Sequence, residues 1–143
     1  MLANAVIVVD YEQDMVDVMR QTLEKEGYQV HGFTDPANAL IHAKDCKDCD
    51  TIVSDIRMPG MNGIQLVRAV KKLRPDMKVV LTTAFEIDKN EWQQVLPSTE
   101  VDAFVTKPFR MIKLVEAIQR IQRCTPQTQA ELPSDDFHSM LGL

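Results

Sequence analysis

Short apolar runs alternate with amphipathic segments from residue 5 to about residue 123. The run Ala5-Val6-Ile7-Val8-Val9 is continuous and mostly β-branched, which is typical of a strand covered on both faces. Within residues 12–26 the apolar positions recur at helical spacing, and Gly27 follows as a stop signal. Residues 28–33 predict a second, more polar strand at an edge of the sheet. Asp35-Pro36 then opens a short helix, because proline suits a first helical turn.

The same rhythm continues through the second half of the chain. Residues 51–54 predict a third strand, and a helix is expected from Gly63 to about Arg74 because its apolar residues share one face. The remaining expected elements are a strand at 78–82, a helix containing Trp92 and Val95, a strand at 101–105, and a strongly periodic helix from Met111 to Ile121.

Five strands alternating with five helices predict a single α/β domain over residues 1–123. Such an order favours a doubly wound parallel sheet, with right-handed crossovers and helices on both faces. Residues 124–143 differ, since they are polar and contain prolines, so we expect a flexible tail. Two alternatives stay open: a docking segment built on Phe137, Met140 and Leu141, or the root of a truncated region.

Composition narrows the function classes. The chain has 143 residues, 45% of them apolar, and a formal net charge of −5. A negative chain argues against direct nucleic-acid binding, because phosphate contacts depend on an excess of Lys and Arg. No apolar run approaches the roughly 20 residues that cross a bilayer, and residues 1–9 lack the cationic start of a secretory signal. We therefore expect no membrane partner and a cytoplasmic location.

Two of the three cysteines form a lone CxxC, Cys46-Lys47-Asp48-Cys49, with His42 four residues ahead. This spacing is compatible with a metal site or a redox pair. A tetrahedral zinc site needs four ligands, however, and only three lie nearby in the sequence. The favoured interpretation is two thiols in a loop between a helix and a strand.

Polar side chains follow four of the predicted strands. Asp10 ends the first strand, Asp55 the third, Thr83 the fourth and Lys107 the fifth. Ligands of open parallel α/β sheets bind at the carboxyl ends of the strands, near the point where strand order reverses. These residues should therefore gather at one rim. Each residue could have an ordinary structural role on its own, such as helix capping by Asp10. Their joint position at the strand ends favours a functional site.

The chemistry of such a rim follows from its charges. Two carboxylates about 4 Å apart repel each other by about 4 kcal/mol at an effective dielectric near 20. A cation relieves that repulsion, and hard oxygen ligands favour Mg²⁺. A carboxylate beside Mg²⁺ and a lysine can attack phosphorus. The residues suit the roles of nucleophile (Asp55), hydroxyl donor (Thr83) and cation (Lys107).

The chain resembles the receiver domain of two-component response regulators over residues 5–123. The segments that carry the resemblance are Val8-Val9-Asp10, Ser54-Asp55-Ile56-Arg57-Met58-Pro59-Gly60-Met61-Asn62-Gly63, Thr83-Ala84, Phe104 and Lys107-Pro108-Phe109. The resemblance implies a flavodoxin-like (βα)5 fold with strand order 2-1-3-4-5, the order that the family illustrates among doubly wound sheets. It also implies a phosphorelay switch without dedicated enzymatic turnover.

The resemblance assigns roles position by position. Asp55 would accept the phosphoryl group from a sensor histidine kinase or a phosphotransfer protein. Asp10, Asp55 and the backbone carbonyl of Arg57 would bind Mg²⁺. Thr83 and Lys107 would contact the phosphoryl group. Phe104 would turn inward with Thr83 as the switch, at the face formed by the fourth helix, fifth strand and fifth helix. That face would serve an unidentified output protein or a homodimer.

One position departs from the family pattern. Receivers usually carry two adjacent acids after the first strand, and here the second is Tyr11. A phenol with a pKa near 10 is a poor Mg²⁺ ligand, while Glu12 is a further candidate. Two outcomes compete: weakened Mg²⁺ binding by Asp10, Asp55 and Arg57, which we favour, or a pseudo-receiver that acts only through interactions.

Other function classes fit less well. A nucleotide-binding flavodoxin-like protein needs a glycine-rich phosphate loop, and neither a GxGxxG nor a Walker sequence occurs. An aspartyl phosphatase needs a cap over its substrate, for which 143 residues leave no room. An interaction-only module remains the principal rival.

Overall fold

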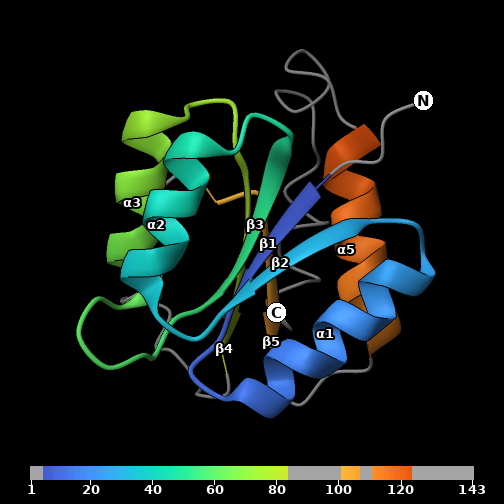
Figure 1. The fold of residues 1–143 in the computed structure, drawn as a ribbon. Helices are drawn as coiled ribbons and strands as arrows, with labels where there is room; N and C mark the ends of the chain where they lie inside the picture. The colour runs from blue at the N-terminus through green and yellow to red at the C-terminus, as the bar shows by residue number, and fades with distance from the viewer. Residues whose placement is uncertain (1–4, 84–100, 107–110, 124–143) are drawn as a thin grey trace.

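The computed structural model describes residues 5–83, 101–106 and 111–123 (Figure 1). Three expectations fall outside the described residues: the helix around Trp92, the position of Lys107, and the tail at 124–143. The described elements are β1 (Ala5–Val9), α1 (Gln13–Lys25), β2 (Gln29–Phe33), α2 (Pro36–Asp45), β3 (Cys49–Asp55), α3 (Gly63–Leu73), β4 (Lys78–Thr83), β5 (Ala103–Thr106) and α5 (Met111–Arg123).

The five strands form one parallel sheet in the order β2-β1-β3-β4-β5. Helices α2 and α3 cover one face, and α1 and α5 cover the other (Figure 1). The predicted fold class and strand order are confirmed. Because the chain moves outward from β1 to β2 and then returns to β3 on the other side, strand order reverses between β1 and β3. This reversal is where a parallel α/β sheet binds ligands.

The continuous apolar run of β1 supplies both halves of the core. Ile7 and Val9 pack into the cluster under α2 and α3, while Val6 and Val8 pack into the cluster under α1 and α5. All four are fully buried. Successive residues of a strand point to opposite faces. In a strand covered on both faces every side chain is therefore buried, which explains why all residues of this run are apolar. No helix of the described residues has the length and hydropathy of a membrane span.

Local hydrogen bonds start the helices where the sequence predicts. The Asp35 carboxylate accepts a 2.9 Å bond from the Ala37 N–H before α2. At α3, Asn62 and Gln65 form a capping box, each side chain accepting from the other residue's backbone N–H. Such caps satisfy amide donors that have no partner within the helix. The loop after β3 therefore ends at a fixed point.

The strands that differ most from the predicted bounds are β3 and β5. β3 begins at Cys49 rather than at Thr51, because residue 49 already pairs with Ala5 across a register shift. Cys49 therefore lies in the sheet rather than in the expected loop. β5 spans Ala103–Thr106 rather than 101–105. The Asp102 carboxylate accepts a 2.7 Å bond from the Val79 N–H, a donor that a regular ladder would pair with a backbone carbonyl.

Candidate functional site

Strand register brings Asp10 and Asp55 to neighbouring positions at the carboxyl end of the sheet. Val9 pairs with Ser54 across β1 and β3, so each aspartate follows directly after a paired residue. Asp10 is fully buried and Asp55 is 9% exposed. Two carboxylates with so little access to water are costly unless charged or polar partners accompany them. Of the residues predicted at this rim, the structure thus brings Asp10 and Asp55 to neighbouring strand ends.

The Asp10 carboxylate is fixed by the turn that leads into α1. It accepts a 2.9 Å hydrogen bond from the Glu12 N–H, while the Asp10 N–H donates to the Phe33 carbonyl on β2 at 3.1 Å. The N-cap of α1 is Glu12, and that residue makes no side-chain cap. The capping interpretation of Asp10 is therefore wrong: this carboxylate orders the turn and is held at the strand end.

The loop after Asp55 is anchored by a close approach of Gly63. The Gly63 N–H donates to the Ile56 carbonyl at 2.8 Å, and the Ile56 N–H donates to the Thr82 carbonyl at 3.0 Å. A Cβ at residue 63 would collide with the Asp55 carbonyl oxygen and lie 2.9 Å from its carbon. Gly60 adopts a φ of +78°, which glycine accepts without strain. Both glycines keep the loop carrying Arg57 next to Asp55.

The two candidate ligands that follow Asp10 do not share its burial. Tyr11 is 60% exposed, and Glu12 is also exposed at the start of α1. The carboxylates buried at this end of the sheet, among the described residues, are those of Asp10 directly after β1 and Asp55 at the end of β3. Their oxygens fit Mg²⁺, which favours hard ligands and commonly uses one or two carboxylates.

The candidate switch residues lie on the neighbouring pair of strands. Thr83 is 3% exposed and Phe104 is 2% exposed, and the ring of Phe104 belongs to the core cluster under α2 and α3. Thr83 pairs with Thr106, two residues beyond Phe104, so alternation directs Thr83 and Phe104 to the same face of the sheet. The structure thus has the aromatic ring in an inward, buried position.

Sequence reasoning overlooked Thr82. This residue pairs in register with Asp55, and its hydroxyl is buried without a hydrogen-bond partner among the described residues. A buried polar atom without a partner costs about 1–3 kcal/mol. Two consecutive threonines at the end of an apolar strand were the signal, but only Thr83 had been singled out.

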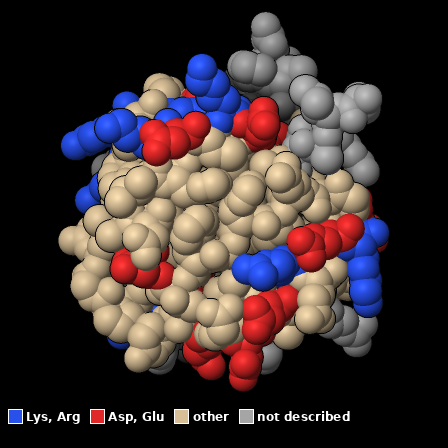
Figure 2. Space-filling view, viewed as in Figure 1, with Lys and Arg blue, Asp and Glu red and all other residues tan. Residues whose placement is uncertain are grey.

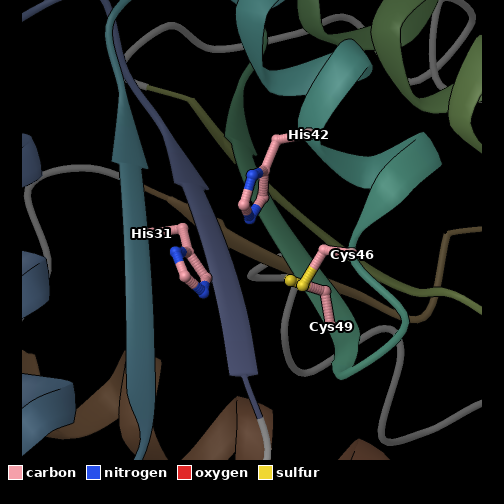
Figure 3. A group of neighbouring side chains, drawn as sticks. All are labelled: His31, His42, Cys46 and Cys49. Carbon is pink, nitrogen blue, oxygen red and sulfur yellow. The ribbon is translucent and has the colours of Figure 1, made fainter.

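A second cluster overturns the expectation of an incomplete CxxC site. The structure brings His31 from β2 next to His42, Cys46 and Cys49, so four ligand-bearing side chains meet (Figure 3). We call these four residues the His/Cys quartet. His31 was missed because it precedes His42 by eleven positions and lies on another element. The quartet lies away from the rim, at the other end of β3.

Charge on the face of the molecule seen in Figure 2 is mixed. Figure 2 shows acidic and basic side chains interspersed, with a largely uncharged area in the middle of the face in view. No continuous basic patch gathers on that face among the described residues.

Comparisons with known proteins agree with this geometry. A family model described as the response regulator receiver domain matches residues 6–119. The chain is 33% identical over 120 residues to the C4-dicarboxylate transport transcriptional regulatory protein DctD of Rhizobium meliloti, covering 84% of this chain but 25% of that protein. It is 28% identical over 125 residues to the chemotaxis protein CheY of Thermotoga maritima, covering 85% of this chain and all of that one.

Solved structures show the same architecture. A CheY-like receiver domain protein from Methanospirillum hungatei superposes with a TM-score of 0.79 at 25% identity, covering 92% of this chain and 100% of that one. CheY4 of Vibrio cholerae gives 0.75 at 26% identity, covering 83% and 98% of the two chains.

Proposed function

This chain belongs to the response regulator receiver domain family, and from that premise we propose that Asp55 is the residue that accepts the phosphoryl group. Receiver domains are phosphoacceptor switches of two-component signalling and exchange phosphoryl groups with histidine kinases or phosphotransfer proteins. The observation that carries the proposal is the pair of buried carboxylates, Asp10 and Asp55, at adjacent strand ends where strand order reverses.

The transfer step is a substitution at phosphorus. A carboxylate oxygen of Asp55 forms the new O–P bond as the P–N bond of the donor phosphohistidine breaks, and the bonding electron pair returns to the imidazole nitrogen. Asp10, Asp55 and the Arg57 carbonyl would hold Mg²⁺, with Glu12 as a further candidate. Bound Mg²⁺ supplies positive charge that offsets the negative charge on the carboxylates and phosphoryl oxygens. Asp10 would orient the acceptor by holding that charge beside it.

The remaining roles concern stabilisation and readout. Thr83 would donate its hydroxyl to the phosphoryl group, and Lys107 would pair with it as a cation. A shift of Thr83 toward the phosphoryl group would favour the buried position of Phe104, a change in population between two states. The signal would leave through β5, α5 and the helix expected near Trp92, toward an output protein or a second copy of the chain. Turnover of a separate substrate is not part of this function.

Phosphodonor labelling tests the acceptor. The full chain is incubated with a small-molecule phosphodonor across a Mg²⁺ series and examined by intact mass. We expect one added phosphoryl group in the wild type and in Asp50→Asn, and none in Asp55→Asn. Asp50 is a matched control because it lies on the same strand and is partly buried, where it accepts hydrogen bonds from Thr51 and Gln122.

Two outcomes would overturn the assignment. If Asp55→Asn gains the same mass as the wild type, another residue is the acceptor. If the wild type stays unmodified at saturating Mg²⁺, the chain acts as an interaction-only module, and Tyr11 in place of the second acid becomes the leading explanation.

A further inference from the structure

The His/Cys quartet joins three elements at the amino-terminal half of the sheet. His31 lies in β2, His42 on α2, Cys46 at the C-cap of α2, and Cys49 at the first position of β3. Figure 3 shows the two rings and the two sulfur atoms turned toward one another. Cys49 and Asp55 stand at opposite ends of β3, about 20 Å apart at roughly 3.3 Å per residue. The quartet is therefore separate from the phosphoacceptor rim.

The four ligand atoms are close enough together to surround one metal ion. They all lie within 4.8 Å of one another, and the two imidazole centroids are 4.4 Å apart. Nitrogen and sulfur ligands bind zinc at about 2.0–2.3 Å, which separates ligand atoms by roughly 3.3–3.8 Å in a tetrahedron. Side-chain movements of about 1 Å would close the shell. Four protein ligands leave no open position, as in structural zinc sites.

An unpartnered atom points to a missing ligand. The Nε2 of His42 is buried and has no hydrogen-bond partner among the described residues. Buried polar atoms are nearly always satisfied, so an exception asks for an explanation such as an ion. The fully buried Cys49 lies in the same cluster, and its neighbours are the soft donors that zinc prefers.

Arg74 holds the backbone of the CxxC turn in place. Its guanidinium donates to the carbonyls of Cys46 and Cys49, each at 2.8 Å, and to the carbonyl of Ala43 at 3.2 Å. The Cys46 N–H donates to the His42 carbonyl at 2.8 Å, which keeps these two side chains one helical turn apart. Both cysteines and His42 are thus fixed by contacts that require no metal.

We propose that His31, His42, Cys46 and Cys49 form a structural Zn²⁺ site that ties the edge strand β2 to α2 and β3. Two thiolates balance the charge of one Zn²⁺, so the closed site is neutral. Binding requires deprotonated thiols and neutral imidazoles, and therefore releases protons. A Cys46–Cys49 disulfide is the competing use of the same thiols, and it would exclude the metal.

Metal titration of the full chain tests the site. Reduced, chelator-treated protein is titrated with Zn²⁺ against a chromophoric chelator, and Co²⁺ serves as a spectroscopic probe. We expect one Zn²⁺ per chain and the intense visible bands of tetrahedral Co²⁺ with thiolate charge transfer. Cys46→Ser and His42→Gln should each weaken Zn²⁺ binding more than about 100-fold, which exceeds the usual loss from outer-shell changes.

The chain offers matched controls. Cys124 and His138 are the remaining cysteine and histidine, and Cys124→Ser and His138→Gln should bind Zn²⁺ like the wild type. Asp55→Asn should also bind Zn²⁺ unchanged, which separates this site from the proposed phosphoacceptor. Arg74→Lys should weaken binding by about 10–100-fold while keeping the tetrahedral Co²⁺ spectrum, as expected of a positioning residue.

The variant Cys46→His distinguishes the loss of a metal ligand from a folding defect. That variant keeps a ligand at residue 46 and should retain Zn²⁺ where Cys46→Ser loses it, with thermal unfolding recorded for both. The proposal is overturned if Cys46→Ser binds Zn²⁺ as tightly as Cys124→Ser, or if Co²⁺ gives only a weak octahedral spectrum. It is also overturned if reduced protein takes up no metal while mild oxidation joins Cys46 to Cys49, which would identify a redox pair.

Discussion

The two ends of β3 carry opposite chemistries. At the carboxyl end, buried Asp55 lies beside Asp10 and offers hard oxygen ligands. At the amino end, Cys49 lies in the His/Cys quartet with soft sulfur and nitrogen donors. Hard ligands favour Mg²⁺ and soft ones favour Zn²⁺. We therefore expect the proposed Mg²⁺ site and the proposed Zn²⁺ site on this strand to prefer different metals.

The two ends of β3 also differ in the elements that surround each site. The rim is bordered by the loop from Ile56 to Asn62, whose backbone is fixed by Gly63. The quartet lies between an edge strand, a helix end and a strand start, and Arg74 donates to the carbonyls of Cys46 and Cys49. We expect the rim to exchange phosphoryl groups and the quartet to hold its metal ion permanently. The following predictions test the two sites separately.

The largest expected effect on stability comes from a substitution at Gly63, next to the rim. Gly63→Ala places a Cβ against the Asp55 backbone, with the Asp55 carbon 2.9 Å away. Since backbone cannot move aside as a flexible side chain can, we expect a loss of about 2–3 kcal/mol in the free energy of unfolding. Phosphodonor labelling of Asp55 should slow as well. Urea unfolding and labelling rates are the measurements, and Zn²⁺ affinity should stay unchanged.

Gly60→Ala is the matched control in the same loop. Gly60 has a φ of +78° but nothing within 4 Å of an added Cβ. Its cost should be only the backbone strain of about 1–2 kcal/mol. Equal losses in labelling for both variants would show that loop strain, rather than contact with Asp55, controls the rim.

The rim could be predicted from sequence because its residues end successive strands. Parallel strands bring their carboxyl ends to one edge of the sheet, so locating Asp10 and Asp55 after apolar runs was enough. The sequence shows Thr82 at the same strand end, but it does not show that this hydroxyl is buried without a partner among the described residues, because that depends on packing. Neither could the exposure of Tyr11, which depends on the path of the turn into α1.

The quartet could not be predicted for a related reason. Cys46, Cys49 and His42 share a local spacing, but His31 reaches them only through packing of α2 against the edge strand. The position of Cys49 within β3 was a further surprise, because this strand was expected to begin only at Thr51. Side chains that meet across elements leave no periodic signal, whereas residues at strand ends do.

A moderate effect on Mg²⁺ affinity is expected at Tyr11, the position where the chain departs from the usual receiver pattern. Tyr11→Asp restores an acid next to Asp10, so Mg²⁺ affinity should rise about tenfold, equivalent to about 1.4 kcal/mol, with faster labelling of Asp55. Mg²⁺ titration measures the change. Val18→Asp adds the same charge at a 44% exposed position on α1 and should change neither value. Equal Mg²⁺ affinities for Tyr11→Asp and the wild type would contradict the ligand assignment.

The smallest expected effect on stability comes from Asp76, the exposed carboxylate that pairs with Arg74. Asp76 accepts hydrogen bonds from the guanidinium at 3.2 and 3.1 Å, and this contact lowers the pKa of its carboxyl below the usual 3.8. The stabilisation is therefore present above that value and is lost as the pH falls through the lowered pKa. Because Asp76 is 67% exposed, Asp76→Asn should cost at most about 0.5 kcal/mol at neutral pH. In urea unfolding from pH 7 to about 3, the difference from wild type should shrink as Asp76 becomes protonated.

The same variant sharpens the contrast between the two ends of β3. If Arg74 organises the CxxC turn through the carbonyls of Cys46 and Cys49, then Asp76→Asn should leave Zn²⁺ affinity within about twofold of wild type, while Arg74→Lys weakens it by about 10–100-fold. Equal losses in the two variants would mean that the ion pair, rather than the carbonyl contacts, holds the turn. The rim provides the reference, since neither variant should alter labelling of Asp55 at the other end of the strand.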